Sequence, residues 1–422
     1  MRALAQRLPV HYGWVIVAVG ILANAATIGT TFWVVALYIT SIPDDLSASR
    51  TAIFGAFTMG QVLSALVVPW IGGLIDRGGP RRMLIIGTFA MPIAMIATSF
   101  STNLWQLYGG WILVGLARSF LTPIPYNWLI TRWFQGRSRQ VSLGLVTTGF
   151  AMGGAVVLPA LAWVDTISGW QQVMFTAGVA NFVLQGLGAL LVADRPNDLS
   201  LRPNGAPAEA EEEVIEGGFT SREASRSIVF WLIALGMSLF FLGQGSVNNL
   251  IVDFFDSRAM VGGAGLLALT ALLRTLGRAP LSLILYRVDR VFVLAILVSL
   301  AQGLAIAVLV SITGTGGVVA WVLLWGIGGA FSPMLEPLLI TRAFGVRHYG
   351  AVAGLVSMIT FGGQIMGPLA GTLLFDVTGS YTIPFSLYSG GFFVAAMLWG
   401  MAAILMNGAT FRGAVRRAGM DS

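Results

Sequence analysis

Long apolar runs separated by short polar segments repeat along the whole chain. They occupy residues 13–39, 51–75, 83–100, 104–130, 141–164 and 169–192 in the first half, and 228–252, 260–286, 291–312, 318–341, 350–375 and 382–406 in the second. A helix needs about 20 apolar residues to cross the hydrocarbon core of a bilayer. Lipid offers no partner to an exposed backbone group, and the period-two alternation of a barrel is absent, so the runs predict helices. The expected fold class is an all-α polytopic membrane protein with twelve transmembrane helices.

Composition agrees with a surface that faces lipid. Of the 422 residues, 56% are hydrophobic and 10% are charged, whereas a soluble domain carries about 25% charged residues. Cysteine is absent, and the two histidines are far apart in the sequence. With no ligand cluster and no nucleophile–base pair, the sequence predicts no metal, no cofactor and no enzyme activity.

The distribution of positive charge predicts the orientation in the membrane. All 24 positive residues are arginines. Arg50 and Arg258 follow the first and seventh runs, three arginines lie inside runs, and the others lie at the termini and in the even-numbered loops. The positive-inside rule then places both termini in the cytoplasm. We expect a multi-pass protein of the cell inner membrane with no nucleic-acid partner, because topology explains the net charge of +6. The first run exceeds the core of a signal peptide and is expected to be retained.

A polar stretch divides the runs into two groups of six. Residues 194–227 contain "AEAEEEVIEGG", which predicts a flexible cytoplasmic linker, and "FTSREASRS", which predicts a short surface helix. The halves, 1–193 and 228–422, share Leu-Ile-Thr-Arg at the ends of their fourth runs, within "NWLITRWFQG" and "PLLITRAFGV". Six plus six helices with an internal repeat are typical of one large class of secondary transporters.

The loop between the second and third runs reads "GGLIDRGGPRR", from Gly72 to Arg82. It resembles the cytoplasmic loop motif of the major facilitator superfamily, in which an aspartate can face helix N-termini or neighbouring arginines. The resemblance implies a latch that stabilises one access state, although a plain positive-inside loop would also be basic. The counterpart "LILYRVDRV" keeps only Asp289 and Arg290. The motif residues singled out are Gly72, Asp76, Arg77, Gly79 and Arg81.

Several further segments resemble the monocarboxylate transporter and oxalate–formate exchanger group of that superfamily. They include "GRSRQVSLGLVTTGFAMGGAVVLPAL" (136–161), "ADRPNDLSLRPNG" (193–205) and "LEPLLITRAFG" (335–345). The resemblance implies that Arg278 matches the arginine that holds the carboxylate of the substrate. Arg274 stands where the monocarboxylate transporters have an aspartate, and the lysine used by both branches of the group is absent here. Proton coupling by the usual residues is therefore not expected.

Three arginines interrupt the apolar runs. Arg274 and Arg278 are four residues apart, on one face of a helix, and Arg118 is central in the run 104–130. Each arginine at mid-membrane costs about 2.5–3.5 kcal/mol, while Glu336 is the one convincing carboxylate inside a run. This excess of positive charge predicts an anionic ligand, and a guanidinium pairs with a carboxylate bidentately. The group also uses aromatic hydroxyls. The candidate substrate-binding residues are Arg278, Arg274, Arg118 and Tyr126.

Other interpretations of these residues stay open at the level of sequence. Arg278 could snorkel to the interface, and Arg118 could bond to carbonyls around "TPIP" (122–125). Glu336 is a candidate coupling residue, or a partner of Arg132 or Arg342. Five amides inside the runs could line the substrate path or bond one helix to another. These are Asn24, Gln61, Gln244, Asn248 and Gln364.

Taken together, these features predict a secondary transporter that moves a small organic anion, a mono- or dicarboxylate, by alternating access. Proton symport and anion exchange both stay open as the energy source. The expected partners are the anion, the lipid bilayer and, for symport, protons, with the monomer as the functional unit. The alternative is a major facilitator exporter of drugs or other non-anionic solutes. A membrane sensor or an integral-membrane enzyme is a further rival that no motif supports.

Overall fold

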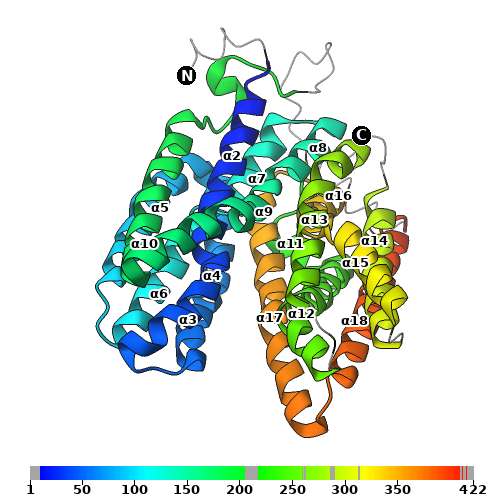
Figure 1. The fold of residues 1–422 in the computed structure, drawn as a ribbon. Helices are drawn as coiled ribbons and strands as arrows, with labels where there is room; N and C mark the ends of the chain where they lie inside the picture. Colours follow the sequence, from blue (N-terminus) through cyan, green and yellow to red (C-terminus); the bar gives the residue numbers. More distant parts are fainter. Residues whose placement is uncertain are drawn as a thin grey trace. The chain divides into compact units, whose positions relative to one another are not determined.

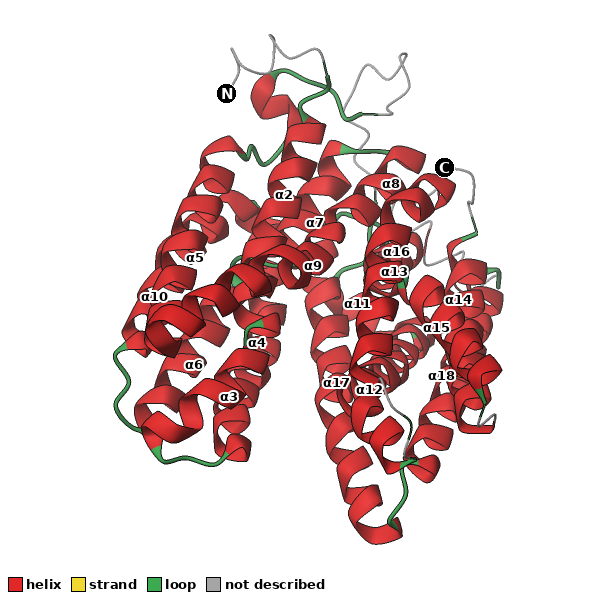
Figure 2. Cartoon of the chain, in the orientation of Figure 1, coloured by secondary structure: helices red, strands yellow, loops and turns green. Residues whose placement is uncertain are grey.

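The computed structural model describes residues 10–204, 217–258, 260, 263–285, 290–311, 314–408, 411 and 415. Within these ranges the chain is almost entirely helical, and no β-strand occurs apart from two isolated bridges. Figure 2 shows the helices joined by short loops. The predicted all-α fold is confirmed.

The chain divides into two compact units, coloured along the sequence in Figure 1. Unit 1 contains Met1–Ile215 together with Tyr349–Gly354, and unit 2 contains Glu216–His348 and Leu355–Ser422. The helices of the first 204 residues are α2 (Gly13–Ile28), α3 (Val35–Leu46), α4 (Arg50–Gly78), α5 (Pro80–Ser99), α6 (Leu104–Ser119), α7 (Ile124–Trp133), α8 (Gly136–Val146), α9 (Thr148–Met152) and α10 (Leu158–Leu191). Those that follow are α11 (Ser221–Arg226), α12 (Ile228–Ser257), α13 (Gly263–Leu285), α14 (Val291–Ser311), α15 (Thr315–Gly329), α16 (Ser332–Phe344), α17 (Tyr349–Thr378) and α18 (Thr382–Met406).

The helices account for the twelve predicted spans. In the described part of the chain, 9 helical segments are long and apolar enough to cross a membrane, or 10 when α15 and α16, bent by 40°, count as one. One segment, Gly136–Leu191, has 56 residues and covers the fifth and sixth predicted spans. Its backbone breaks at Gly169, where φ is 76° and ψ is 176°, a conformation that favours glycine. The predicted eighth span corresponds to α13.

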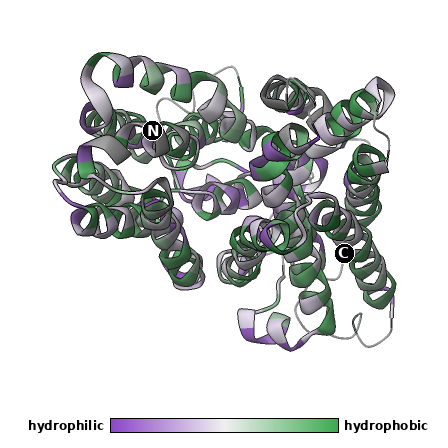
Figure 3. Ribbon diagram, turned by 60° about the horizontal axis from the view of Figure 1, so that its bottom comes forward, coloured by the Kyte–Doolittle hydropathy of each residue, from purple (hydrophilic) through white to green (hydrophobic). Residues whose placement is uncertain are grey.

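The outer faces of the helices carry apolar side chains. Trp105 is 82% exposed and Val377 is 84% exposed, which would be unfavourable in water over so large a surface. Figure 3 shows hydrophobic positions along nearly every helix of both units. Lipid is the solvent that suits this surface, and the protein is a multi-pass membrane protein.

The predicted linker is described in part, because residues 205–216 lie outside the described ranges. The first part lies against the ends of the unit 1 helices. Trp133 Nε1 donates to the Ala193 carbonyl at 2.9 Å, and the Asn204 amide donates to the Trp133 carbonyl at 2.9 Å. The predicted short surface helix is confirmed as α11, which begins with a capping box between Thr220 and Glu223.

Candidate functional site

Arg274 lies on α13 within unit 2, in contact with α12 and α15. Its Nη1 donates to Gln244 Oε1 at 3.2 Å, and its Nε donates to the Trp325 carbonyl at 3.3 Å. The guanidinium carbon lies 4.9 Å from the centroid of the Trp325 ring, an arrangement that attracts a cation to the ring face. A Cβ at Gly329 would come within 2.4 Å of Arg274 Nε, so this glycine leaves room for the guanidinium. Arg274 is therefore held in the helix bundle rather than directed into lipid.

Gln244 belongs to a wider amide network. Its Nε2 donates to Gln302 Oε1 at 2.8 Å and to Ser332 Oγ at 3.2 Å. Gln302 Nε2 donates in turn to the Leu324 carbonyl at 3.1 Å. Because the nitrogen of Gln244 is engaged on this side, its oxygen is turned toward Arg274. The network fixes the acceptor that orients the arginine.

Arg278 follows Arg274 by one helical turn in α13, as the sequence predicts. Its side chain lies outside the described part of the structure. The predicted pair therefore has its backbone on one helix face, whereas contacts are described for Arg274 alone.

Arg118 lies in the last turn of α6 and is 6% exposed. Its Nη1 donates to Gln61 Oε1 on α4. Nearby, Ser64 and Ser119 join the same two helices through a 2.9 Å hydroxyl pair. Arg118 therefore lies in a polar contact between α4 and α6 inside unit 1.

Tyr126 lies on α7 and is fully buried, also inside unit 1. Its hydroxyl donates to Gln185 Oε1 on α10 at 3.3 Å. The Gln185 amide donates to Thr27 Oγ1 at 2.6 Å and to the Ala23 carbonyl at 3.1 Å. Tyr126 and Arg118 thus belong to different helix contacts of unit 1, and Arg274 belongs to unit 2.

Glu336 lies in the first half of α16. Ser357 on α17 donates its hydroxyl to Glu336 Oε1. The sequence suggested an arginine as partner, and the structure instead pairs this carboxyl with a neutral hydroxyl.

The loop motif is ordered around the carboxylate of Asp76. Its Oδ1 accepts from the Gly350 amide and from Trp128 Nε1, each at 2.9 Å, and its Oδ2 accepts from the Ala351 amide at 2.8 Å. Gly350 and Ala351 lie in the first turn of α17, and this turn belongs to unit 1. A carboxylate at a helix N-terminus satisfies free amides and the helix dipole. The motif residue Asp76 therefore caps α17.

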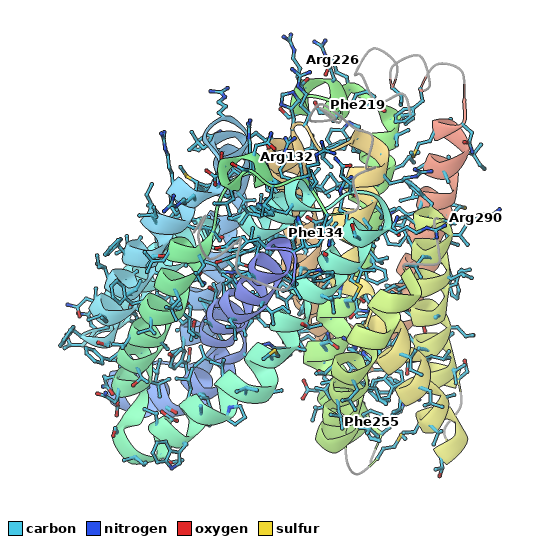
Figure 4. All side chains as sticks on the ribbon, turned by 90° about the horizontal axis from the view of Figure 1, so that it is seen from above. Arg132, Phe134, Phe219, Arg226, Phe255 and Arg290 are labelled. Carbon is cyan, nitrogen blue, oxygen red and sulfur yellow. The ribbon has the colours of Figure 1, made fainter. Side chains whose placement is uncertain are left out.

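The cation near this cap is Arg132. Its guanidinium carbon lies 5.0 Å from the centroid of the Trp128 ring, the same ring whose nitrogen donates to Asp76. Figure 4 shows Arg132 close to Phe134 where α7 ends. The Leu-Ile-Thr-Arg segment of the first half thus ends beside the motif loop.

The second half of the motif begins α5. Gly79 has a φ of 76°, and a Cβ there would lie 2.3 Å from Asp194 Oδ2. Asp194 Oδ1 accepts from the Arg81 amide at 2.9 Å and so caps α5. Burial raises the pKa of Asp194, and the bond from the Arg81 amide opposes this effect. Gly72 touches the Gly350 carbonyl, whereas the Arg77 side chain is exposed.

Little in the sequence indicated the partners of the central arginines. Gln61 and Gln244 were two of five amides without an assigned contact, and the structure pairs them with Arg118 and Arg274. The only available signal was an amide inside an apolar run, which occurs equally at positions that bond helix to helix. Gln302 was missed, although it carries the same signal.

Buried polar networks inside membrane-spanning helices are typical of proteins that move solutes. Residues 19–368 match the family model of the Major Facilitator Superfamily. The chain belongs to this family of membrane transporters.

Curated relatives match at low identity. The chain is 27% identical over 196 residues to the membrane sensor protein UhpC of Salmonella typhimurium, covering 43% of each chain. It is 29% identical over 180 residues to monocarboxylate transporter 14 of Mus musculus, covering 41% of this chain and 34% of the relative. It is 26% identical over 198 residues to the oxalate:formate antiporter of Oxalobacter formigenes, covering 47% of this chain and 45% of the relative. The matches thus span less than half the length of each relative.

Solved structures match over nearly the whole chain. The human organic anion transporter MFSD10 has a TM-score of 0.71 at 13% identity, covering 93% of this chain and 100% of that one. FucP in its outward conformation has a TM-score of 0.68 at 14% identity, covering 91% of this chain and 98% of that one. At these identities the likeness concerns the fold, and it confirms the major facilitator architecture.

Proposed function

We propose that this protein is a secondary transporter that moves a small organic anion, a mono- or dicarboxylate, across the membrane by alternating access. The observation that carries the proposal is the position of Arg274 inside unit 2, where Gln244 and the Trp325 carbonyl orient its guanidinium. A guanidinium held in this way presents a planar, permanently charged fork that suits a carboxylate. Arg278, one turn further along α13, is the second candidate substrate-binding cation.

The names of two relatives support the same substrate class. A monocarboxylate transporter and an oxalate:formate antiporter both handle carboxylates by name. Arg118 and Tyr126, inside unit 1, are further candidate substrate-binding residues. In this proposal residues 1–193 and 228–422 form the two halves of the transporter, both termini face the cytoplasm, and the monomer acts in a cell inner membrane.

The motif loop acts as the latch of one access state. Support comes from Asp76, whose carboxylate accepts both amides at the start of α17 and the Trp128 indole. Opening of this contact leaves two helix-terminal amides without their acceptor, which is unfavourable by about 1.5–3 kcal/mol for each charge-assisted bond. The latch thereby biases the transport cycle toward the state in which it is closed.

Glu336 is the candidate carrier of a coupled proton. Its carboxyl is held by the Ser357 hydroxyl on a neighbouring helix of unit 2. A change in its protonation alters this contact between α16 and α17. Anion exchange requires no such carrier, so uptake in the Glu336→Gln variant with and without a pH gradient separates the two modes.

The substrate class is tested by the thermal stability of the detergent-purified protein against a panel of mono- and dicarboxylates, inorganic anions and cationic drugs. A ligand at 100 times its dissociation constant stabilises the native state by about 2.7 kcal/mol. We expect one carboxylate to raise the melting temperature of the wild type, and we expect Arg274→Gln and Arg278→Gln to lose this rise. The matched control is Arg290→Gln, because Arg290 is an exposed arginine of the same unit.

Stabilisation by a cationic drug and by no anion would instead favour an exporter of non-anionic solutes. Because one relative is named a membrane sensor protein, flux across the membrane is measured as a second readout. Binding of a carboxylate without flux into sealed vesicles would contradict transport and favour a sensor.

A further inference from the structure

A second polar cluster lies at the end of unit 1 that is opposite the start of α2 (Figure 1). There α3 packs against the first part of α10, before the break at Gly169. Tyr38 and Ser41 are three residues apart on α3 and so share one helix face. Ser41 donates its hydroxyl to Asp165 Oδ2 on α10 at 2.5 Å. The Ser41 hydroxyl and the Asp165 carboxylate thus meet between the two helices, and Ser41 shares its helix face with Tyr38.

Tyr38 is buried in this cluster. Its side chain is 1% exposed, and its ring lies edge-on to Trp111 with the centroids 5.9 Å apart. Within the described part of the chain its hydroxyl has no hydrogen-bond partner. A buried hydroxyl of this kind normally has a partner.

One carboxylate oxygen of Asp165, Oδ1, also lacks a hydrogen-bond partner in the part of the chain that the structure describes. Oδ1 is buried and accepts no hydrogen bond from the described residues, while Oδ2 is held by the neutral Ser41 hydroxyl. No described arginine forms an ion pair with this carboxylate. A carboxylate oxygen removed from water is compensated by a hydrogen bond, by a proton or by a positive charge, and a bound cation supplies the last of these.

Asp45, one turn beyond Ser41 on α3, provides a comparison on the same two helices. Its carboxylate accepts from Trp170 Nε1 at 2.8 Å and from Gln171 Nε2 at 3.4 Å, and its side chain is exposed. Water and neutral donors therefore suffice for Asp45. Asp165 differs from Asp45 in having a buried oxygen that no described donor reaches.

We propose that Asp165, Ser41 and Tyr38 form a binding site for a monovalent alkali cation. Carboxylate and hydroxyl oxygens are the donors that hard cations prefer. The Ser41 and Tyr38 oxygens keep lone pairs after donating their protons, so both can face a cation together with Asp165 Oδ1. The single negative charge balances one positive charge, whereas a divalent ion would leave an excess and usually takes more carboxylates.

The cation site is separate from the arginine site of the proposed function, and it is tested without any organic anion. The purified protein is melted in NaCl, KCl and choline chloride at equal ionic strength. We expect NaCl or KCl to raise the melting temperature saturably, by about 3 °C or more over choline. Asp165→Asn removes the charge at nearly constant shape and is expected to lose the response and to be more stable in choline than the wild type. Asp45→Asn is the matched control and is expected to keep the response.

If Asp165→Asn does not fold, a second variant and a direct measurement of cation binding still test the proposal. Tyr38→Phe removes one oxygen and is expected to weaken binding of ²²Na⁺ to the purified protein about tenfold, while wild type and Asp45→Asn bind it equally. The proposal is overturned if neither NaCl nor KCl raises the melting temperature above that in choline chloride and no ²²Na⁺ binds. In that case Tyr38 donates directly to Asp165. The proposal is also overturned if Asp45→Asn, and not Asp165→Asn, loses the response.

Discussion

The contact between Gly72 on α4 and Gly350 on α17 makes a sharp prediction about the motif loop. A Cβ on Gly72 would lie 1.9 Å from the Gly350 carbonyl oxygen, and real Cβ contacts are essentially never below 3.0 Å. The backbones must therefore separate by about 1 Å in Gly72→Ala, which takes the 2.8–2.9 Å bonds of Asp76 out of the normal hydrogen-bond range. Overpacking of this kind costs about 1–3 kcal/mol, equivalent to roughly 5- to 150-fold in the population of the closed contact.

Hydrogen–deuterium exchange of the peptide that contains Gly350 and Ala351 measures this opening directly. We expect these amides to exchange about 5- to 150-fold faster in Gly72→Ala than in the wild type. Gly73→Ala is the control on the same helix, because a Cβ at Gly73 meets nothing within 4 Å. Equal exchange in the two variants would refute the argument that Gly72 permits the cap by Asp76.

Three other substitutions test separate parts of the account. Asp194→Ala removes the cap of α5 and should lower the free energy of unfolding by about 1 kcal/mol. Because burial raises the Asp194 pKa from 3.8, the stability that comes from proton binding at Asp194 is fully present below 3.8 and is lost as the pH rises through the raised pKa. This pH-dependent part is separate from the capping hydrogen bond and should vanish in Asp194→Asn. Arg258→Lys breaks the fork that reaches the end of α14 and Thr382 and should cost about 1–3 kcal/mol in thermal unfolding; an unchanged melting temperature would contradict this. Gln244→Leu should weaken carboxylate binding about tenfold, about 1.4 kcal/mol, by releasing Arg274, and unchanged affinity would exclude a positioning role.

The helices could be predicted well from the sequence because lipid imposes one requirement on every span. Any run of about 20 apolar residues has to satisfy its own backbone, so run length alone gives the element. The break at Gly169 agrees with the predicted boundary between the fifth and sixth spans. The short helix α11 was also predictable, because a capping box is a local signal.

The contacts of the site were harder to predict, because they join helices that are distant in the sequence. Arg274 was identifiable as a buried cation from its cost in lipid. Its partner Gln244 lies on another helix, and nothing local distinguishes this glutamine from Gln302. Asp76 was expected to face a helix N-terminus or neighbouring arginines, and only the structure shows that it caps the N-terminus of α17.

Asp165 illustrates a different limit. It lies near the end of an apolar run, where an acidic residue is expected to be solvated. Its burial depends on α3 packing across α10 and on the orientation of Tyr38 and Ser41, which no local pattern reveals.

The most direct test of the account is uptake of a radiolabelled carboxylate into proteoliposomes, with the carboxylate chosen as the strongest stabiliser in the thermal panel. We expect saturable uptake by the wild type and by Arg290→Gln. In correctly folded Arg274→Gln we expect uptake to fall at least about tenfold, equivalent to about 1.4 kcal/mol. Full uptake by Arg274→Gln, or no carboxylate flux by the wild type, would contradict the claim that this arginine binds a transported anion.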